Sequence, residues 1–133
     1  MDRSRERGGT AVEVAIILPV LVLIIFGIIE FGLLLYDQQV VTNASREGAR
    51  AGIVQADPRP GLAAINSVVN SYTTGYLISL GTASPAVSLP TGPCTVSGNN
   101  LIVSVTYPYA FLVLGNLGFR GPTLNARTTM VCE

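Results

Sequence analysis

The sequence predicts an α+β protein in which one long N-terminal helix carries a small head. Three observations lead to this fold class. The N-terminal third holds a membrane-length apolar stretch, from Val14 to Tyr36, with a single charge at Glu30. Residues 62–80 have apolar side chains at spacings of three and four, which is typical of an amphipathic helix. Later residues alternate apolar and polar side chains in short runs, which is typical of strands.

The apolar stretch is predicted to be a retained, single-pass membrane helix. As a helix it would be about 34 Å long, sufficient to cross the hydrocarbon core. A cleavable secretory signal has only about 7–15 apolar residues and a small-x-small site after them, whereas Asp37, Gln38 and Gln39 follow here. Arginines are concentrated before the stretch, so we expect a cytoplasmic N terminus and a translocated head. Glu30 should then lie near the outer interface, where a charge costs less.

Glu13 stands at the inner edge of this stretch and needs compensation, because a carboxylate at the membrane boundary is costly. Cleavage between Gly8 and Gly9 would create an amino terminus about one helical turn away. That amine could neutralise Glu13 within one subunit or across two. The layout points to a pilin-type protein.

The helix is predicted to continue to residue 56, just before the break at Asp57-Pro58. Small residues recur every four positions in this stem, at Ala44, Gly48, Gly52 and Ala56. Such a stripe allows another backbone to approach closely, either the head or a neighbouring stem. A plain alanine-rich helix with a solvated charged face would show the same pattern. Pro19 should kink or loosen the membrane segment, which indicates a packing role or ordinary tolerance of proline in membrane helices.

The head is predicted to contain one amphipathic helix and a small antiparallel sheet of three to four strands. The helix should end near Gly81, with Tyr72 and Tyr76 in a helix–sheet core. Strands are expected at residues 86–89, 94–97, 101–107 and 123–132. The loop 110–121 (AFLVLGNLGFRG) is unusually apolar. It either folds onto the helix or forms a contact surface for assembly or the membrane.

The two cysteines, Cys94 and Cys132, are expected to form a disulfide if the head is exported to an oxidising compartment. Closing the intervening loop would stabilise the head by about 4 kcal/mol. They would remain free thiols if the head faced the cytoplasm.

Composition argues against several function classes. The chain is neutral, with eight basic and eight acidic residues, and residues 9–133 hold five arginines against six acids. This is unlike the basic surface of nucleic-acid-binding proteins. There is no histidine to complete a zinc site with two cysteines, and no nucleophile motif such as G-x-S-x-G. We therefore expect no catalytic residues, metal, cofactor or nucleic-acid partner.

Residues 8–54 resemble the TadE-like family of pseudopilins, or minor pilins, of the tight-adherence (Flp, type IVc) pilus system. The resemblance rests on Gly8, on Glu13 at the fifth position after the cut, and on Leu18-Pro19. It continues with a G-x-x-E-F-G element at residues 27–32 and an A-x-R-E-G-A-R-A block at residues 44–51. Val14 departs from the tyrosine that major pilins of this system usually carry, and the head is longer than theirs. Both differences favour a minor subunit.

The resemblance implies three regions: a leader (1–8), a transmembrane and stem helix (9–56) and a head (57–133). It implies cleavage by a prepilin peptidase, and assembly with other pilin and pseudopilin subunits on an inner-membrane platform. The protein would sit in the lipid bilayer of a bacterial inner membrane with its head in the periplasm, and enter an extracellular pilus after assembly. The alternative is an unprocessed, signal-anchored periplasmic scaffold or adhesion module.

Overall fold

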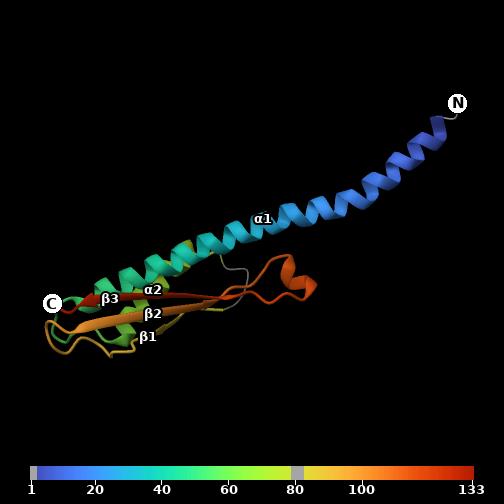
Figure 1. Ribbon diagram of the computed structural model, residues 1–133. Coiled ribbons are helices and arrows are strands. Elements are labelled where there is room, and N and C mark those ends of the chain that lie inside the picture. The colour runs from blue at the N-terminus through green and yellow to red at the C-terminus, as the bar shows by residue number, and fades with distance from the viewer. Residues whose placement is uncertain (1–2, 79–82) are drawn as a thin grey trace.

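The computed structural model, which describes residues 3–78 and 83–133, shows a long helix projecting from a small α+β head (Figure 1). Helix α1 spans Arg3–Ile53 and α2 spans Leu62–Tyr76. The strands are β1 (Ala86–Ser88), β2 (Asn100–Pro108) and β3 (Thr123–Val131), and a short 3-10 helix, η1 (Leu114–Leu117), precedes β3. The predicted α+β class, with its long helix, second helix and small antiparallel sheet, is confirmed.

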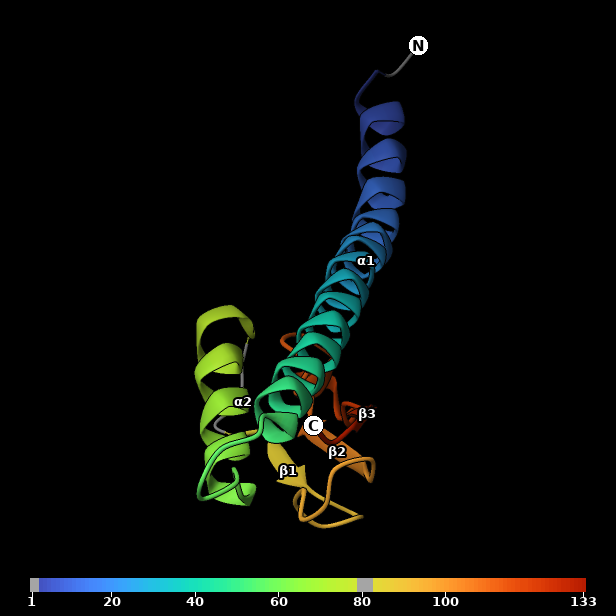
Figure 2. The ribbon, with the colours of Figure 1, turned by 90° about the vertical axis from the view of Figure 1, so that its left-hand side faces the viewer.

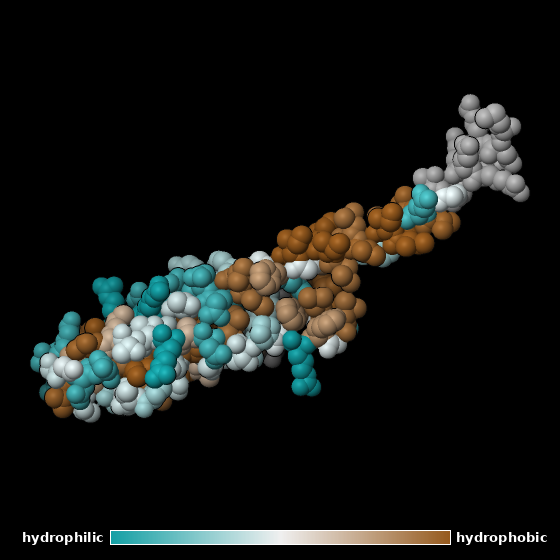
Figure 3. Space-filling model, in the orientation of Figure 1, coloured by the Kyte–Doolittle hydropathy of each residue, from teal (hydrophilic) through white to brown (hydrophobic). Residues whose placement is uncertain are grey.

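Helix α1 runs without interruption through Pro19, although its blue N-terminal third changes direction in Figure 1. Proline removes one backbone hydrogen bond and crowds the preceding turn, which accounts for a bend in this part of the helix. Most apolar side chains from Val12 to Phe31 are exposed, and Figure 3 shows them as a brown surface beyond the head. By length and composition α1 is suited to cross a membrane, which makes it the candidate membrane anchor.

The three strands form one antiparallel sheet in the order β1-β2-β3. Val87 pairs with Val105, and Tyr107 pairs with Leu124. The expected alternation in β2 is confirmed, since Leu101, Val103, Val105 and Tyr107 are all buried. These side chains therefore form one side of the hydrophobic core.

The strand predicted at residues 94–97 is wrong. Two prolines before Cys94 cannot donate to a strand ladder. The segment turns instead, with Asn99 N–H donating to Val96 O at 3.4 Å and Gly98 N–H donating to Cys132 O at 2.9 Å. It is held to the end of the chain rather than paired along β2.

The C-terminal half of α1 and all of α2 cover the buried face of the sheet, and Figure 2 shows the two helices side by side. The core between these two layers includes Val41, Ala44, Ile65 and Val69 together with the inward side chains of β2 and β3. The stem of α1 is thus an integral part of the head.

The buried face of α2 differs from the one expected. Ile65, Val69 and Thr73 are buried, whereas Tyr76 is 57% exposed and Tyr72 is only partly buried against the core. The three buried side chains recur every four residues along α2 and face α1. They are smaller than tyrosine, so they allow the two helices to approach more closely than Tyr72 and Tyr76 would. The helix ends at Tyr76, and Gly81 lies outside the described residues.

Candidate functional site

The residues of the predicted cleavage site lie in the bare N-terminal part of α1. Gly8 and Gly9 are both helical, and a Cβ atom built on Gly9 would meet nothing within 4 Å. Glu13 follows four residues after Gly9 and is exposed. Helical side chains incline toward the N terminus, so the Glu13 carboxylate is on the side of the turn where a cut at Gly8 would leave an amine. Figure 1 shows this end of α1 projecting away from the head.

Three of the four small residues of the stem, Ala44, Gly48 and Gly52, lie at the contact between α1, α2 and the sheet. The helix predicted to residue 56 ends at Ile53, and Ala56 is exposed beyond it. Ala44 is fully buried. A Cβ atom on Gly48 would be 2.7 Å from Val69 Cγ2, and one on Gly52 would be 2.6 Å from Leu101 Cδ2. Both distances are below van der Waals contact, so these glycines set how closely the layers approach. In this conformation these residues pack against α2 and β2 of the same chain.

Glu30 is the residue that sequence reasoning missed. Its position near the outer interface stays a prediction, whereas the structure shows that its side chain is 1% exposed and covered by the loop around η1. Its carboxylate accepts a short hydrogen bond from Val113 N–H and longer ones, at 3.3 and 3.4 Å, from Leu114 N–H. These N–H groups begin a helical turn and have no partner within it. The sequence contained one signal of this contact, a single charge within an apolar helix and a separate loop that is also apolar. It did not show that the two pair, because they are 83 residues apart.

A tyrosine and a second buried carboxylate extend this contact toward the sheet. Tyr109 O–H donates to the backbone oxygen of Glu30 at 3.5 Å, and its ring meets Phe111 edge-on with centroids 5.6 Å apart. Burial raises the pKa of the Tyr109 hydroxyl, and the negative charges of Asp37 and Glu30 and the nearby Tyr107 raise it further. Asp37 is fully buried, with Oδ1 accepting from Ile78 N–H at 3.0 Å. Its other oxygen, Oδ2, has no hydrogen-bond partner in the described part of the chain.

An apolar cavity separates η1 from the membrane segment. It has a volume of about 290 Å³ and is lined on the α1 side by Pro19, Val22, Leu23 and Phe26. Val113, Leu114 and Leu117 line the opposite side. The loop that the sequence marked as unusually apolar therefore lies beside the predicted membrane segment, with its N–H groups turned to Glu30.

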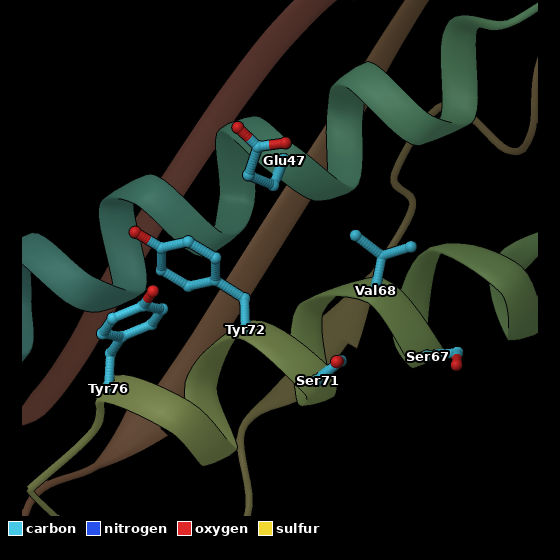
Figure 4. Close-up of a pocket in the computed structure, with 6 residues that line it drawn as sticks. All are labelled: Glu47, Ser67, Val68, Ser71, Tyr72 and Tyr76. Atoms are coloured by element: carbon cyan, nitrogen blue, oxygen red, sulfur yellow. The ribbon is translucent and has the colours of Figure 1, made fainter.

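A second hollow lies between α1 and α2 and is more open. Figure 4 shows Glu47 on α1 above Tyr72, with Tyr76, Ser71, Val68 and Ser67 along α2. The two tyrosine rings are tilted against each other, with centroids 4.9 Å apart. This is a water-facing groove with a single carboxylate, and it lacks the converging polar groups of an enclosed ligand site.

The head is closed by a disulfide between Cys94 and Cys132, with Cα atoms 5.8 Å apart. Both half-cystines are buried at the end of the sheet. The alternative of two free thiols is therefore not what the structure contains.

Among the described residues, no group of three or more histidine, cysteine, aspartate or glutamate side chains could hold a metal ion. The absence of a metal and of a cofactor stays a prediction.

Comparison with protein families gives a match, whereas no curated protein and no solved structure matches the chain. The match is to the family model described as TadE-like protein, and it covers residues 8–50. It contains the Gly8-Gly9 pair, Glu13, Pro19, Glu30 and the first part of the small-residue stripe. The resemblance noted from the sequence is confirmed, and the chain carries a TadE-like segment over residues 8–50.

Proposed function

We propose that this chain is a minor pilin, or pseudopilin, that takes part in assembling a type IVc (tight-adherence) pilus. The TadE-like family links residues 8–50 to pilus components that are structural rather than enzymatic. The observation that carries the proposal is Glu13, an exposed carboxylate at the start of an apolar helix surface that the head leaves bare. Such a surface is suited to packing among other subunit helices.

In the proposed sequence of events, a prepilin peptidase first removes residues 1–8 at the cytoplasmic face of the inner membrane. The scissile bond lies inside α1, so local unwinding must precede cutting. Two adjacent glycines favour this, because each is about 1 kcal/mol less stable than alanine in a helix interior. The released Gly9 amine then neutralises Glu13 in its own subunit or in a neighbour.

After cleavage, the assembly platform would extract the helix from the bilayer and pack it with other pilin and pseudopilin helices. In that low-dielectric bundle an unpaired carboxylate would be strongly unfavourable. Pairing between Glu13 and a Gly9 amine would therefore select processed subunits in the correct axial position.

The test compares Glu13→Gln with Glu47→Gln, a matched change at an exposed carboxylate on the head side of α1. We expect both variants to be processed and to fractionate with membranes, whereas Glu13→Gln alone reduces pilus number at least tenfold by electron microscopy. Normal piliation of Glu13→Gln would contradict the role given to Glu13.

The continuity of α1 across Gly8 and Gly9 also suits the alternative, an unprocessed signal-anchored scaffold or adhesion module. Mass spectrometry of the N terminus in the native host separates the two. A chain that starts at Gly9 supports the pilin, and one that starts at Met1 supports the anchored module.

A further inference from the structure

We propose that the η1 loop, residues 110–119, inserts into the outer leaflet of the bilayer beside α1 and contacts lipid acyl chains. The inference rests on the membrane-anchored helix of the proposed function, and goes beyond it by giving the head its own lipid contact. It starts from the position of the loop, which lies along the same stretch of α1 that is expected to cross the membrane.

The depth of the loop follows from helix geometry. The arginines before Gly8 and the carboxylate of Glu13 mark the inner boundary. A hydrocarbon core of about 30 Å takes up about 20 helical residues from there, which puts its outer boundary near Leu33. Glu30 is then about 5 Å inside that boundary and Phe26 about 10 Å inside it. The η1 loop is bonded to Glu30 and lines a cavity with Phe26, so it cannot stay in water while the helix spans the bilayer.

Five backbone N–H groups of the loop have acceptors within the protein. Glu30 accepts from the N–H groups of Val113 and Leu114. Within the loop itself, the N–H groups of Asn116, Gly118 and Phe119 donate to backbone oxygens at 3.1 Å. An unsatisfied backbone N–H group is costly in hydrocarbon, so each of these hydrogen bonds lowers the free energy needed to place the loop there. Glu30 thus supplies the acceptor that the short 3-10 turn lacks.

The side chains of the loop match the same environment. Leu112, Leu117 and Phe119 are 45%, 57% and 61% exposed. Figure 3 shows the brown surface of the helix continuing onto the neighbouring part of the head. The cavity between loop and helix is lined only by apolar residues, and its volume of about 290 Å³ suits part of an acyl chain. Exposed Arg120, at the end of the loop, can extend its charged group back to the lipid headgroups.

The test uses tryptophan fluorescence, because the chain contains no tryptophan. Three single-tryptophan variants are reconstituted in phosphatidylcholine vesicles with and without bromine on the acyl chains. Leu117→Trp probes the loop, and Leu21→Trp probes the membrane helix. Val96→Trp, at a residue 59% exposed on the far side of the head, is the matched control. Mass analysis confirms an intact disulfide in each.

We expect brominated lipid to quench Leu117→Trp and Leu21→Trp at least twofold and to leave Val96→Trp unchanged. Quenching of Leu21→Trp alone overturns the loop insertion and leaves the anchored helix intact. A blue-shifted but unquenched Leu117→Trp also overturns it, because the loop is then buried against protein. If Leu21→Trp is not quenched, both proposals, the membrane anchor and the inserted loop, are contradicted. A quenched loop, together with a chain from the native host that starts at Met1, would overturn the pilin and leave the loop insertion standing.

Discussion

At the scale of single residues, Gly48 is the position where the smallest side chain matters most. A Cβ atom there would be 2.7 Å from a methyl group of Val69 and 3.3 Å from one of Ile65. The valine cannot move aside easily, because a β-branched side chain in a helix has one strongly preferred rotamer. At Gly52 the nearest atoms are the ends of Leu101 and Ile65, which are more flexible.

We therefore predict that Gly48→Ala destabilises the head by about 1 kcal/mol. Overpacking costs about 1–3 kcal/mol, and the better helix propensity of alanine returns about 1 kcal/mol. Gly75→Ala is the matched control, because it changes an exposed helical glycine with nothing within 4 Å and should be stabilising. Denaturant unfolding in detergent micelles measures both. Equal stabilisation by the two changes would show that α1 and α2 can separate without cost.

Tyr109 makes stability depend on pH at the alkaline end. Its pKa is raised in the folded state, chiefly by burial and then by Asp37, Glu30 and Tyr107. The folded protein therefore binds the hydroxyl proton more tightly than the unfolded chain does. The stability from this group is complete below the ordinary tyrosine pKa of about 10 and is lost as the pH rises through the folded-state value.

We predict that unfolding midpoints of the unsubstituted protein fall between pH 9.5 and 11 (about the tyrosine range) more steeply than those of Tyr109→Phe. Tyr76→Phe, at an exposed tyrosine, is the matched control. A Tyr109→Phe profile as steep as that of the unsubstituted protein would assign the alkaline loss of stability to other groups.

At the scale of elements, one carboxylate joins α1 to the η1 loop. Glu30→Ala removes the acceptor of two N–H groups, and an unsatisfied buried donor costs about 1–3 kcal/mol. We predict that the amides of Val113 and Leu114 exchange hydrogen at least tenfold faster in this variant, measured by NMR in micelles. Amides of β2 should keep their protection. Uniform acceleration across the head would mean that Glu30 supports the whole fold instead of one loop.

The disulfide fastens the segment before β2 to the end of β3. Cys94 and Cys132 are 38 residues apart, and closing a loop of this length stabilises by about 4 kcal/mol in the chain-entropy model. We predict that replacing both with serine lowers the free energy of unfolding of the head by about 4 kcal/mol, with unchanged membrane fractionation. Reduction of the unsubstituted protein should give a similar loss. A change below about 1 kcal/mol would show that hydrogen bonds such as Cys132 N–H to Asn99 O already hold the end of the chain.

At the scale of the whole molecule, the bare end of α1 and its packed end have different tasks. The first is exposed and, in the proposed function, contacts the membrane and other subunits, whereas the second belongs to the core of the head. We predict that Gly8→Ala blocks removal of residues 1–8, so that the protein keeps its full mass in the native host. The stability of the head should not change, because the N-terminal end of α1, which includes Gly8, projects away from the head (Figure 1). Gly27→Ala, at a helical glycine with nothing within 4 Å, is the control and should be processed normally. If Gly8→Ala still gave mature protein with the same mass as processed protein without the substitution, the proposed cleavage site would be wrong.

The sequence by itself determined the features that depend on local pattern: the long apolar helix, the strand alternation in Leu101–Tyr107 and the TadE-like segment. Periodicity reports which side chains share a face, and the helix and the strand follow from it. The TadE-like segment follows from its motifs. The tertiary structure decided which faces meet. It turned Ile65, Val69 and Thr73 of α2 inward in place of the tyrosines, and it brought the η1 loop to Glu30. The physical reason is that close packing and buried hydrogen bonds join residues far apart in the chain, and one sequence carries no direct signal of that distance.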